Sequence, residues 1–293
     1  MAGREVPPGS LVIFGLVAAV GWGLADFFGA VAGRRIGPVV TVIAGQVLSA
    51  LAVSVVVLVT GTSLDSLSPS VGLVLANGIV AGFAYLTHYK ALELGPVAIV
   101  SPIGAAYAVV GVLLAIVVLD ERPSGIALTG AALAVVGVIL VSTDLRQLRE
   151  GIRQRLPGVP WSIAAAIAFG VAGFLLGWIS QRAGWVAGLW GSRVAQVACY
   201  LPLALVFRRE FGRLRADAGL WVALLAGAAD FLGVAAFSAG AERGFVSIVL
   251  AATAVFPLIA VALSIAVFEE RIVANQVVGI VLVVGGLLLL GLG

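Results

Sequence analysis

Three charged side chains lie inside long apolar stretches of this sequence: Asp26, Arg193 and Asp230. An ionised group at the depth of a lipid bilayer costs at least ~2.5 kcal/mol, so it normally serves binding, proton transfer or a buried ion pair. Arginine is suited to a substrate carboxylate, and aspartate to an amine or a proton. We treat these three as the first candidates for a binding site. The alternative is a purely structural pair of Arg193 with Asp26 or Asp230.

Six further polar or aromatic residues occupy similar surroundings. Imidazole titrates near neutral pH, so His88 would make binding pH-sensitive, although a hydrogen-bonded helix-end role is the alternative. Trp22 and Tyr107 are candidates for substrate contact or for ordinary aromatic packing. The remaining candidates are Gln46, Asn77 and Tyr85.

Apolar blocks of about 20 residues must position these groups. Of 293 residues, 62% are hydrophobic and 11% are charged, whereas a soluble domain carries about 25% charged residues. Ten blocks are expected to be membrane helices, at residues 11–33, 37–60, 71–93, 97–119, 124–143, 161–180, 184–207, 218–241, 245–268 and 272–292. The sequence therefore predicts an all-α protein with ten transmembrane helices in the inner or plasma membrane.

An internal repeat relates the two halves of the chain. The segment Val117–Arg122 (VVLDER) ends one apolar block, and Ala266–Arg271 (AVFEER) ends another 149 residues later. The same shift aligns Gly21 with Gly170. VVLDER and AVFEER are thus one helix boundary present in two copies.

The repeat predicts two five-helix units, at residues 11–143 and 159–292, joined by an Arg-rich linker at 144–158. Because each unit has an odd number of spans, the two must lie in opposite orientations. Inverted repeats of this kind recur in secondary transporters, whose substrate site lies near the membrane midplane between the halves.

Helical spacing directs the polar candidates to a shared centre. At about 100° per residue, Asn77, Tyr85 and His88 fall on the same side of the third helix as Ala81. The 149-residue shift places Asp230 at the position of Ala81, so the eighth helix presents its carboxylate on the matching face.

Two further signals support this arrangement. With a two-residue gap near the second helix, Gln46 aligns with Arg193, which gives the second and seventh helices polar groups at corresponding points. Pro102 and Pro257 remove backbone hydrogen bonds in the fourth and ninth helices, which predicts either breaks that line a cavity and serve gating or plain kinks.

Short motifs occur in a characteristic order: WG at Trp22–Gly23, YKAL at Tyr89–Leu92, a proline at Pro102, LDER at Leu119–Arg122 and FEER at Phe268–Arg271. Over roughly residues 11–292, this order resembles the drug/metabolite transporter superfamily and, more narrowly, its EamA group. The resemblance implies efflux of small metabolites such as amino acids or drugs, and it does not fix the substrate.

The sequence lacks the residues that a disulfide, a multi-histidine metal site or a common enzyme motif would need. Cys199 is the sole cysteine and His88 the sole histidine, so neither an internal disulfide nor a multi-histidine metal site is expected. The chain has no Walker loop, HExxH or GxSxG motif, and we expect no cofactor and no enzyme activity. The boundary acids Asp120 and Glu121 are expected to favour the N-terminal dipole of the next helix rather than to form a catalytic pair.

The distribution of arginine predicts the orientation. Loops after odd-numbered helices hold eleven arginines, and the other face holds four: Arg4, Arg122, Arg182 and Arg243. The positive-inside rule places the Arg-rich loops in the cytoplasm and both termini outside, whereas relatives in the family are thought to keep their termini inside. Loop arginines of this kind also argue against nucleic-acid binding.

The expected function is secondary transport of an amino-acid-like or drug-like metabolite by alternating access, with the substrate and the lipid bilayer as partners. In this hypothesis Arg193 binds a substrate carboxylate, while Asp230 or Asp26 takes an amine or a proton. Proton coupling and oligomer formation stay open. The alternatives are a membrane-embedded translocase of lipid-linked groups and a non-transporting membrane scaffold.

Overall fold

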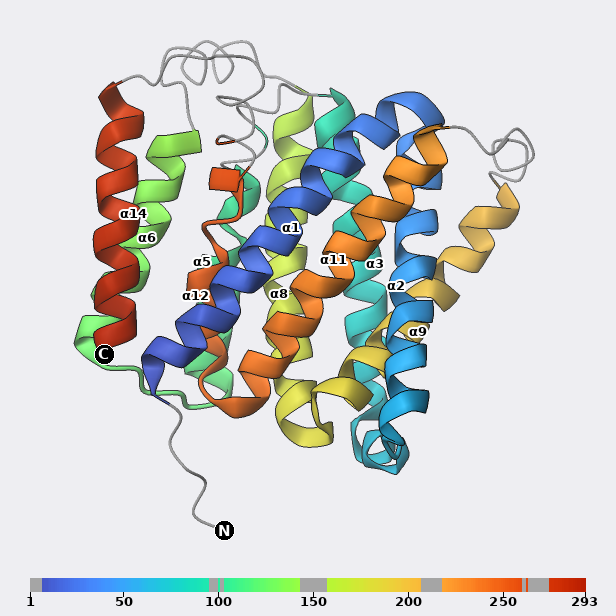
Figure 1. The fold of residues 1–293 in the computed structure, drawn as a ribbon, viewed down its shortest axis with the longest axis horizontal. Coiled ribbons are helices and arrows are strands. Elements are labelled where there is room, and N and C mark those ends of the chain that lie inside the picture. The colour runs from blue at the N-terminus through green and yellow to red at the C-terminus, as the bar shows by residue number, and fades with distance from the viewer. Residues whose placement is uncertain are drawn as a thin grey trace.

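Figure 1 shows the chain as a computed structural model that describes residues 7–94, 100, 103–142, 157–206, 218–259, 262 and 274–293. These residues form ten α-helices and a short 3-10 helix, with no strand among them. The elements are α1 (Pro8–Ile36), α2 (Pro38–Thr60), η1 (Asp65–Ser70), α3 (Val71–Leu94), α5 (Tyr107–Val118), α6 (Gly125–Ser142), α8 (Gly158–Ala183), α9 (Trp185–Val206), α11 (Ala218–Arg243), α12 (Val246–Thr253) and α14 (Ala274–Leu292). Each α-helix overlaps one block expected from the sequence, so the all-helical class is confirmed.

Six helices in the described part of the chain are long and apolar enough to cross a membrane, namely Pro8–Ile36, Pro38–Thr60, Asp65–Ala91, Gly158–Ala183, Ala218–Arg243 and Asn275–Leu292. Large apolar side chains point outward along these helices; Leu58 is 80% exposed and Leu232 is 62% exposed. Such surfaces are compatible with lipid and not with water. The chain is a multi-pass membrane protein.

Glycine ends the first helix of each half. Gly37 follows α1 with φ 85° and Gly184 follows α8 with φ 84°, a backbone region that glycine adopts without a steric penalty. In each case the glycine N–H donates to a carbonyl of the last helical turn, to Gly33 or to Ser180. The chain therefore reverses at the corresponding point of both halves.

Small residues bring the helices into backbone contact. Along α1 and α11, Gly21 lies against Gly233, and the two helices run antiparallel, as Figure 1 shows. At the edge of the bundle, α6 lies beside α14 in the same way, because Gly130 meets Gly286 while Gly137 meets Gly279. Without Cβ atoms the helix axes approach closely, which is how membrane helices gain packing energy in lipid.

The helix contacts are matched when the two halves are exchanged. The pair α1 with α11 corresponds to the pair α8 with α3, and α2 with α11 corresponds to α9 with α3. Helices that are equivalent in the repeat also contact each other directly: α2 with α9, α5 with α12, and α6 with α14. The two halves therefore interlock and do not fold as separate bundles.

The start of α1 and the end of α14 lie at the same end of the helix bundle. Gly9 near the start of α1 lies against Gly291 near the end of α14. The loop between α5 and α6 and the loop between α11 and α12 lie at this same end of the bundle (Figure 1). Three features noted in the sequence fall outside the described residues: Pro102, the acids Glu269 and Glu270 of the AVFEER segment, and nearly all of the linker at 144–158.

Candidate functional site

A cavity lies between the two halves of the bundle, with walls from α1, α2, α3, α8, α9 and α11. Its space between atoms is about 1130 Å³, including the part that opens to its surroundings. All nine polar and aromatic residues selected from the sequence line it: Trp22, Asp26, Gln46, Asn77, Tyr85, His88, Tyr107, Arg193 and Asp230. The structure brings them together, and their functional roles remain predictions.

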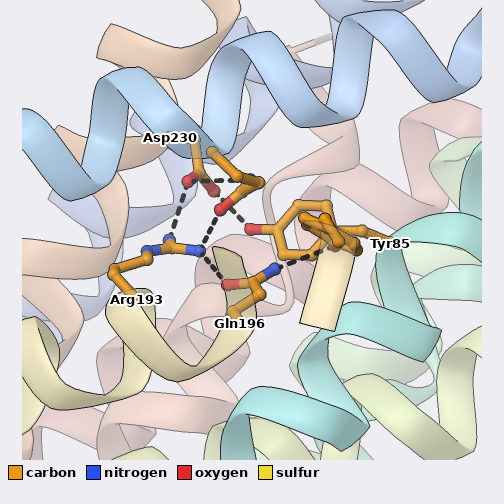
Figure 2. A network of polar contacts seen from close by, with 6 residues as sticks. Tyr85, Arg193, Gln196 and Asp230 are labelled. Atoms are coloured by element: carbon orange, nitrogen blue, oxygen red, sulfur yellow. Dashed lines mark hydrogen bonds and ion pairs between the residues drawn. The ribbon is translucent and has the colours of Figure 1, made fainter. Parts of the chain in front are cut away.

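Arg193 is held by an internal network, shown in Figure 2. Its Nη2 donates to Oδ2 of Asp230 at 2.7 Å, and its Nη1 donates to Oε1 of Gln196 at 2.8 Å and to Oε1 of Gln46. Arg193 and Asp230 are each 4% exposed. Of the two pairings that the sequence left open, the structure shows Arg193 with Asp230.

Asp230 is also tied to the first half of the chain. The Tyr85 hydroxyl donates to Oδ1 of Asp230, and Gln46 Nε2 donates to Oδ2 at 3.4 Å. The Arg193 guanidinium lies 5.9 Å from the centre of the Tyr85 ring. A buried ion pair is tolerated when further hydrogen bonds surround it, and here they engage both Nη atoms of Arg193 and both carboxylate oxygens of Asp230. Arg193 Nε makes no hydrogen bond to any described residue.

A second pair joins α1 to α3. Nε2 of His88 lies 3.3 Å from Oδ1 of Asp26, and the His88 side chain is nearly buried while that of Asp26 is 27% exposed. Nδ1 of His88 is buried and has no hydrogen-bond partner among the described residues. The His88 ring packs edge-on against Phe169 and Tyr89, which fixes its plane.

Aromatic rings form one wall beside Asp26. The Trp22 ring meets the Tyr107 ring edge to face at 6.3 Å and the Phe237 ring at 5.8 Å between centroids. The Phe256 ring lies 6.0 Å from the Tyr107 ring between centroids. The Tyr107 hydroxyl is hydrogen-bonded to Thr253, so it is already satisfied. The wall therefore offers ring faces more than free polar groups.

Asn77 has a local structural contact. Its Nδ2 donates to the carbonyl of Ala172 at 2.7 Å, which ties α3 to α8 across the two halves. Burial of this amide without a partner would be costly, so the bond explains how asparagine fits between two apolar helices.

Irregular backbone lines the cavity at equivalent points of the two halves. Just before α5, the Ala106 N–H donates to the backbone carbonyl of Ile103. Just after α12, the Phe256 N–H donates to the backbone carbonyl of Thr253. Both bonds have the three-residue spacing of a 3-10 turn. The second break directly precedes the buried Pro257, so the predicted interruption there is present. A gating role for Pro257 remains a prediction.

Sequence reasoning missed several lining residues. Gln196 is one helical turn after Arg193 on the same face, and this spacing was the available signal. Tyr89 follows His88 directly, so the helical spacing argument did not select it. Phe169 and Phe237 are apolar and look like ordinary core residues in sequence.

The boundary acid Glu121 stabilises a helix in the other half of the chain. Its two carboxylate oxygens accept hydrogen bonds from the backbone N–H groups of Val246, at 2.7 Å, and Ser247, at 2.9 Å, at the start of α12. The sequence correctly indicated a helix N-terminus but named the next helix, α6, which was wrong. Asp120 instead is exposed, has φ 51°, and pairs with Arg122 at 3.1 Å.

Comparisons with known proteins agree with this architecture. The sequence model of the EamA-like transporter family matches residues 9–143 and 156–292. No curated protein matches the chain. One solved structure, titled only "Crystal structure of protein", aligns with a TM-score of 0.75 at 17% identity over 96% of each chain. At this identity the likeness shows a shared fold alone.

Proposed function

Because this chain belongs to the EamA-like transporter family, we propose that it exports a small amino-acid-like or drug-like metabolite across the cell membrane by alternating access. The observation that carries the proposal is that the polar candidates of both halves converge on the same cavity. Convergent polar groups in a largely apolar cavity are typical of small-molecule sites. No cofactor or nucleotide drive is part of this proposal.

The helix arrangement supports an inverted repeat as the moving part. α6 and α14 are repeat equivalents, and their glycine contacts run in opposite directions along the chain. Equivalent helices that lie antiparallel are what two units of opposite orientation produce. In the proposal all ten helices cross the bilayer, and the two interlocked units rock around the cavity so that it opens to one side and then to the other.

In this proposal the Arg193–Asp230 pair has a structural role in the cavity wall. Three acceptors inside the protein occupy three of the five guanidinium N–H donors of Arg193, and Asp230 already neutralises its charge, so a substrate carboxylate would find no uncompensated cation there. Asp26 and His88 are left as the ionic groups that are open to a ligand.

The test is counterflow in liposomes that contain the full chain. Vesicles loaded with an unlabelled metabolite mixture should accumulate labelled members of the same mixture, and vesicles without protein should not. Ala81→Phe fills the cavity wall and should abolish the exchange. Ile79→Phe, on the outward face of the same helix and 60% exposed, should leave it unchanged. Equal fluxes in the two folded variants would show that this cavity is not the route.

A further inference from the structure

Resting on the proposed transport function, we infer that Asp26 and His88 form an exchange site in which one proton alternates with one organic cation that carries an apolar or aromatic body. This narrows the substrate class within the proposed function and assigns the coupling ion. The inference depends on the charge of the cavity, on Nδ1 of His88, which has no hydrogen-bond partner among the described residues, and on the aromatic wall beside Asp26.

The charges of the cavity do not balance. Among the lining residues that the structure describes, Arg193 is the only permanent cation, while Asp26 and Asp230 are both carboxylates. Arg193 and Asp230 neutralise each other at 2.7 Å. With His88 neutral, Asp26 leaves one uncompensated negative charge at membrane depth, which is unfavourable unless a cation is present. A bound proton or a bound cation must therefore supply one positive charge to the cavity.

The Asp26–His88 pair can receive that charge as a proton. Protonation gives an imidazolium that faces the Asp26 carboxylate at 3.3 Å. Nδ1 of His88 has no hydrogen-bond partner among the described residues and lies near Gly104, another residue of the cavity wall. A buried ring nitrogen without a partner among the described residues is available to a ligand or to water within the cavity.

The same carboxylate can instead receive an organic cation. Trp22 lies one helical turn before Asp26 on α1, and its ring, with those of Tyr107 and Phe256, forms the wall beside the carboxylate. Aromatic faces attract a cation and also bury its apolar part. A zwitterion or an anion would need an uncompensated cation, whereas the charge of Arg193, the only permanent cation among the described lining residues, is already neutralised by Asp230.

Other titratable groups lie around the pair. Tyr89 of α3 and Tyr107 of α5 are within electrostatic range of Asp26, and the Tyr89 hydroxyl lies against Gly29, one turn from it. Tyr85, Arg193 and Asp230 form the neighbouring network. On α2 and α8, the described lining groups are uncharged, such as Gln46 and Phe169.

The exchange then follows from charge balance. In the proton-loaded form, the imidazolium of His88 balances Asp26. When the organic cation binds Asp26, the proton leaves His88 to the water that fills the open cavity, and His88 remains as a neutral donor to Asp26. Both loaded forms leave the cavity neutral, whereas the empty form carries a negative charge and is disfavoured during reorientation. One proton therefore moves against one cation in each cycle.

Three probes with the same ring and differing charge test the substrate class: N,N,N-trimethyl-2-phenylethylammonium, phenylalanine and 3-phenylpropionate. The quaternary cation has no proton to lose, so any proton released on binding comes from the protein. With the purified full chain in weakly buffered detergent near neutral pH, the cation should bind and release about one proton per cation bound, because only one of the two can balance the Asp26 charge. Phenylalanine and 3-phenylpropionate should do neither.

Variants of the pair locate the effect. Asp26→Asn should weaken cation binding by about tenfold or more and abolish proton release, because a contact to a charged group in a desolvated site contributes at least that much. Asp26→Glu should retain both. His88→Gln keeps a donor toward Asp26 and should retain cation binding, but it should not release a proton near neutral pH, because the proton that leaves is the one on His88. Asp120→Asn, an exposed acid outside the cavity, should match the unaltered protein. Thermal unfolding of each variant confirms that it is folded.

The outcomes separate this inference from the transport proposal. Uptake of the cation into liposomes with an acidic interior, lost in Asp26→Asn, supports both. Transport of phenylalanine or 3-phenylpropionate without the cation overturns the inference and leaves transport standing. Cation binding without proton release, or full activity in folded Asp26→Asn, also overturns it. If none of the probes binds or moves, the inference fails, and the metabolite counterflow decides the transport function by itself.

Discussion

Arg193 donates a hydrogen bond to Gln46, and the two residues occupy equivalent positions in the two halves of the chain. Equivalent residues meet in this way where the axis that relates two repeats passes through the molecule. The second half supplies arginine where the first has glutamine, and it supplies Asp230 where the first has Ala81. The ion pair at the centre is therefore an asymmetric feature of an otherwise matched frame.

Removal of one partner of this pair should destabilise the protein. Arg193→Met or Asp230→Leu alone leaves an unpaired buried charge and should lower the free energy of unfolding by about 3 kcal/mol. The double variant removes both charges and should be more stable than either single variant. Thermal unfolding of the purified variants in one detergent measures the order. Single variants as stable as the unaltered chain would show that the pair is not buried as described.

The carboxylate of Glu121 should stabilise the start of α12. Glu121→Gln replaces one acceptor oxygen with a donor that faces a backbone N–H, and about 2 kcal/mol should be lost. Hydrogen exchange at Val246 and Ser247 should become faster. The neighbouring change Asp120→Asn, at an exposed side chain, should alter stability by less than about 0.5 kcal/mol. Equal protection at Val246 in both variants would contradict the contact.

Adjacent glycines on α14 should respond in opposite ways. A Cβ at Gly286 would lie 2.5 Å from the backbone N of Ala134, so Gly286→Ala should force α6 and α14 apart and cost about 1–3 kcal/mol. A Cβ at Gly285 meets nothing within 4 Å, so Gly285→Ala should be neutral or up to about 1 kcal/mol stabilising, because alanine favours the helix. Unfolding temperatures compare the two, and an equal response would contradict the packing.

Labelling of single engineered cysteines can test the membrane orientation that the arginine distribution predicts. In a Cys199→Ser background, Arg34→Cys and Arg182→Cys place exposed thiols at opposite ends of the bundle. The positive-inside rule predicts that an impermeant maleimide applied to intact cells labels Arg182→Cys, and that Arg34→Cys reacts only after the membrane is opened. The reverse pattern would place both termini in the cytoplasm.

The sequence alone determined the helical class and the candidates at the centre. A membrane helix must be a continuous apolar block, so composition and length located every described α-helix. Lipid penalises ionisable groups, so Asp26, Arg193 and Asp230 stood out without any knowledge of contacts. The internal repeat added the correspondence between Gln46 and Arg193, because equivalent positions of related units face a common axis.

Only the tertiary structure decided the partners. Arg193 could have paired with Asp26 or Asp230, and Glu121 could have capped its own next helix; the fold chose Asp230 and the start of α12. Gln196 and the aromatic wall were likewise assigned by packing. Such choices depend on which helices of opposite halves lie side by side, which local spacing does not encode. Asp26 and His88 stand apart as a second ionisable pair only because Arg193 and Asp230 neutralise each other.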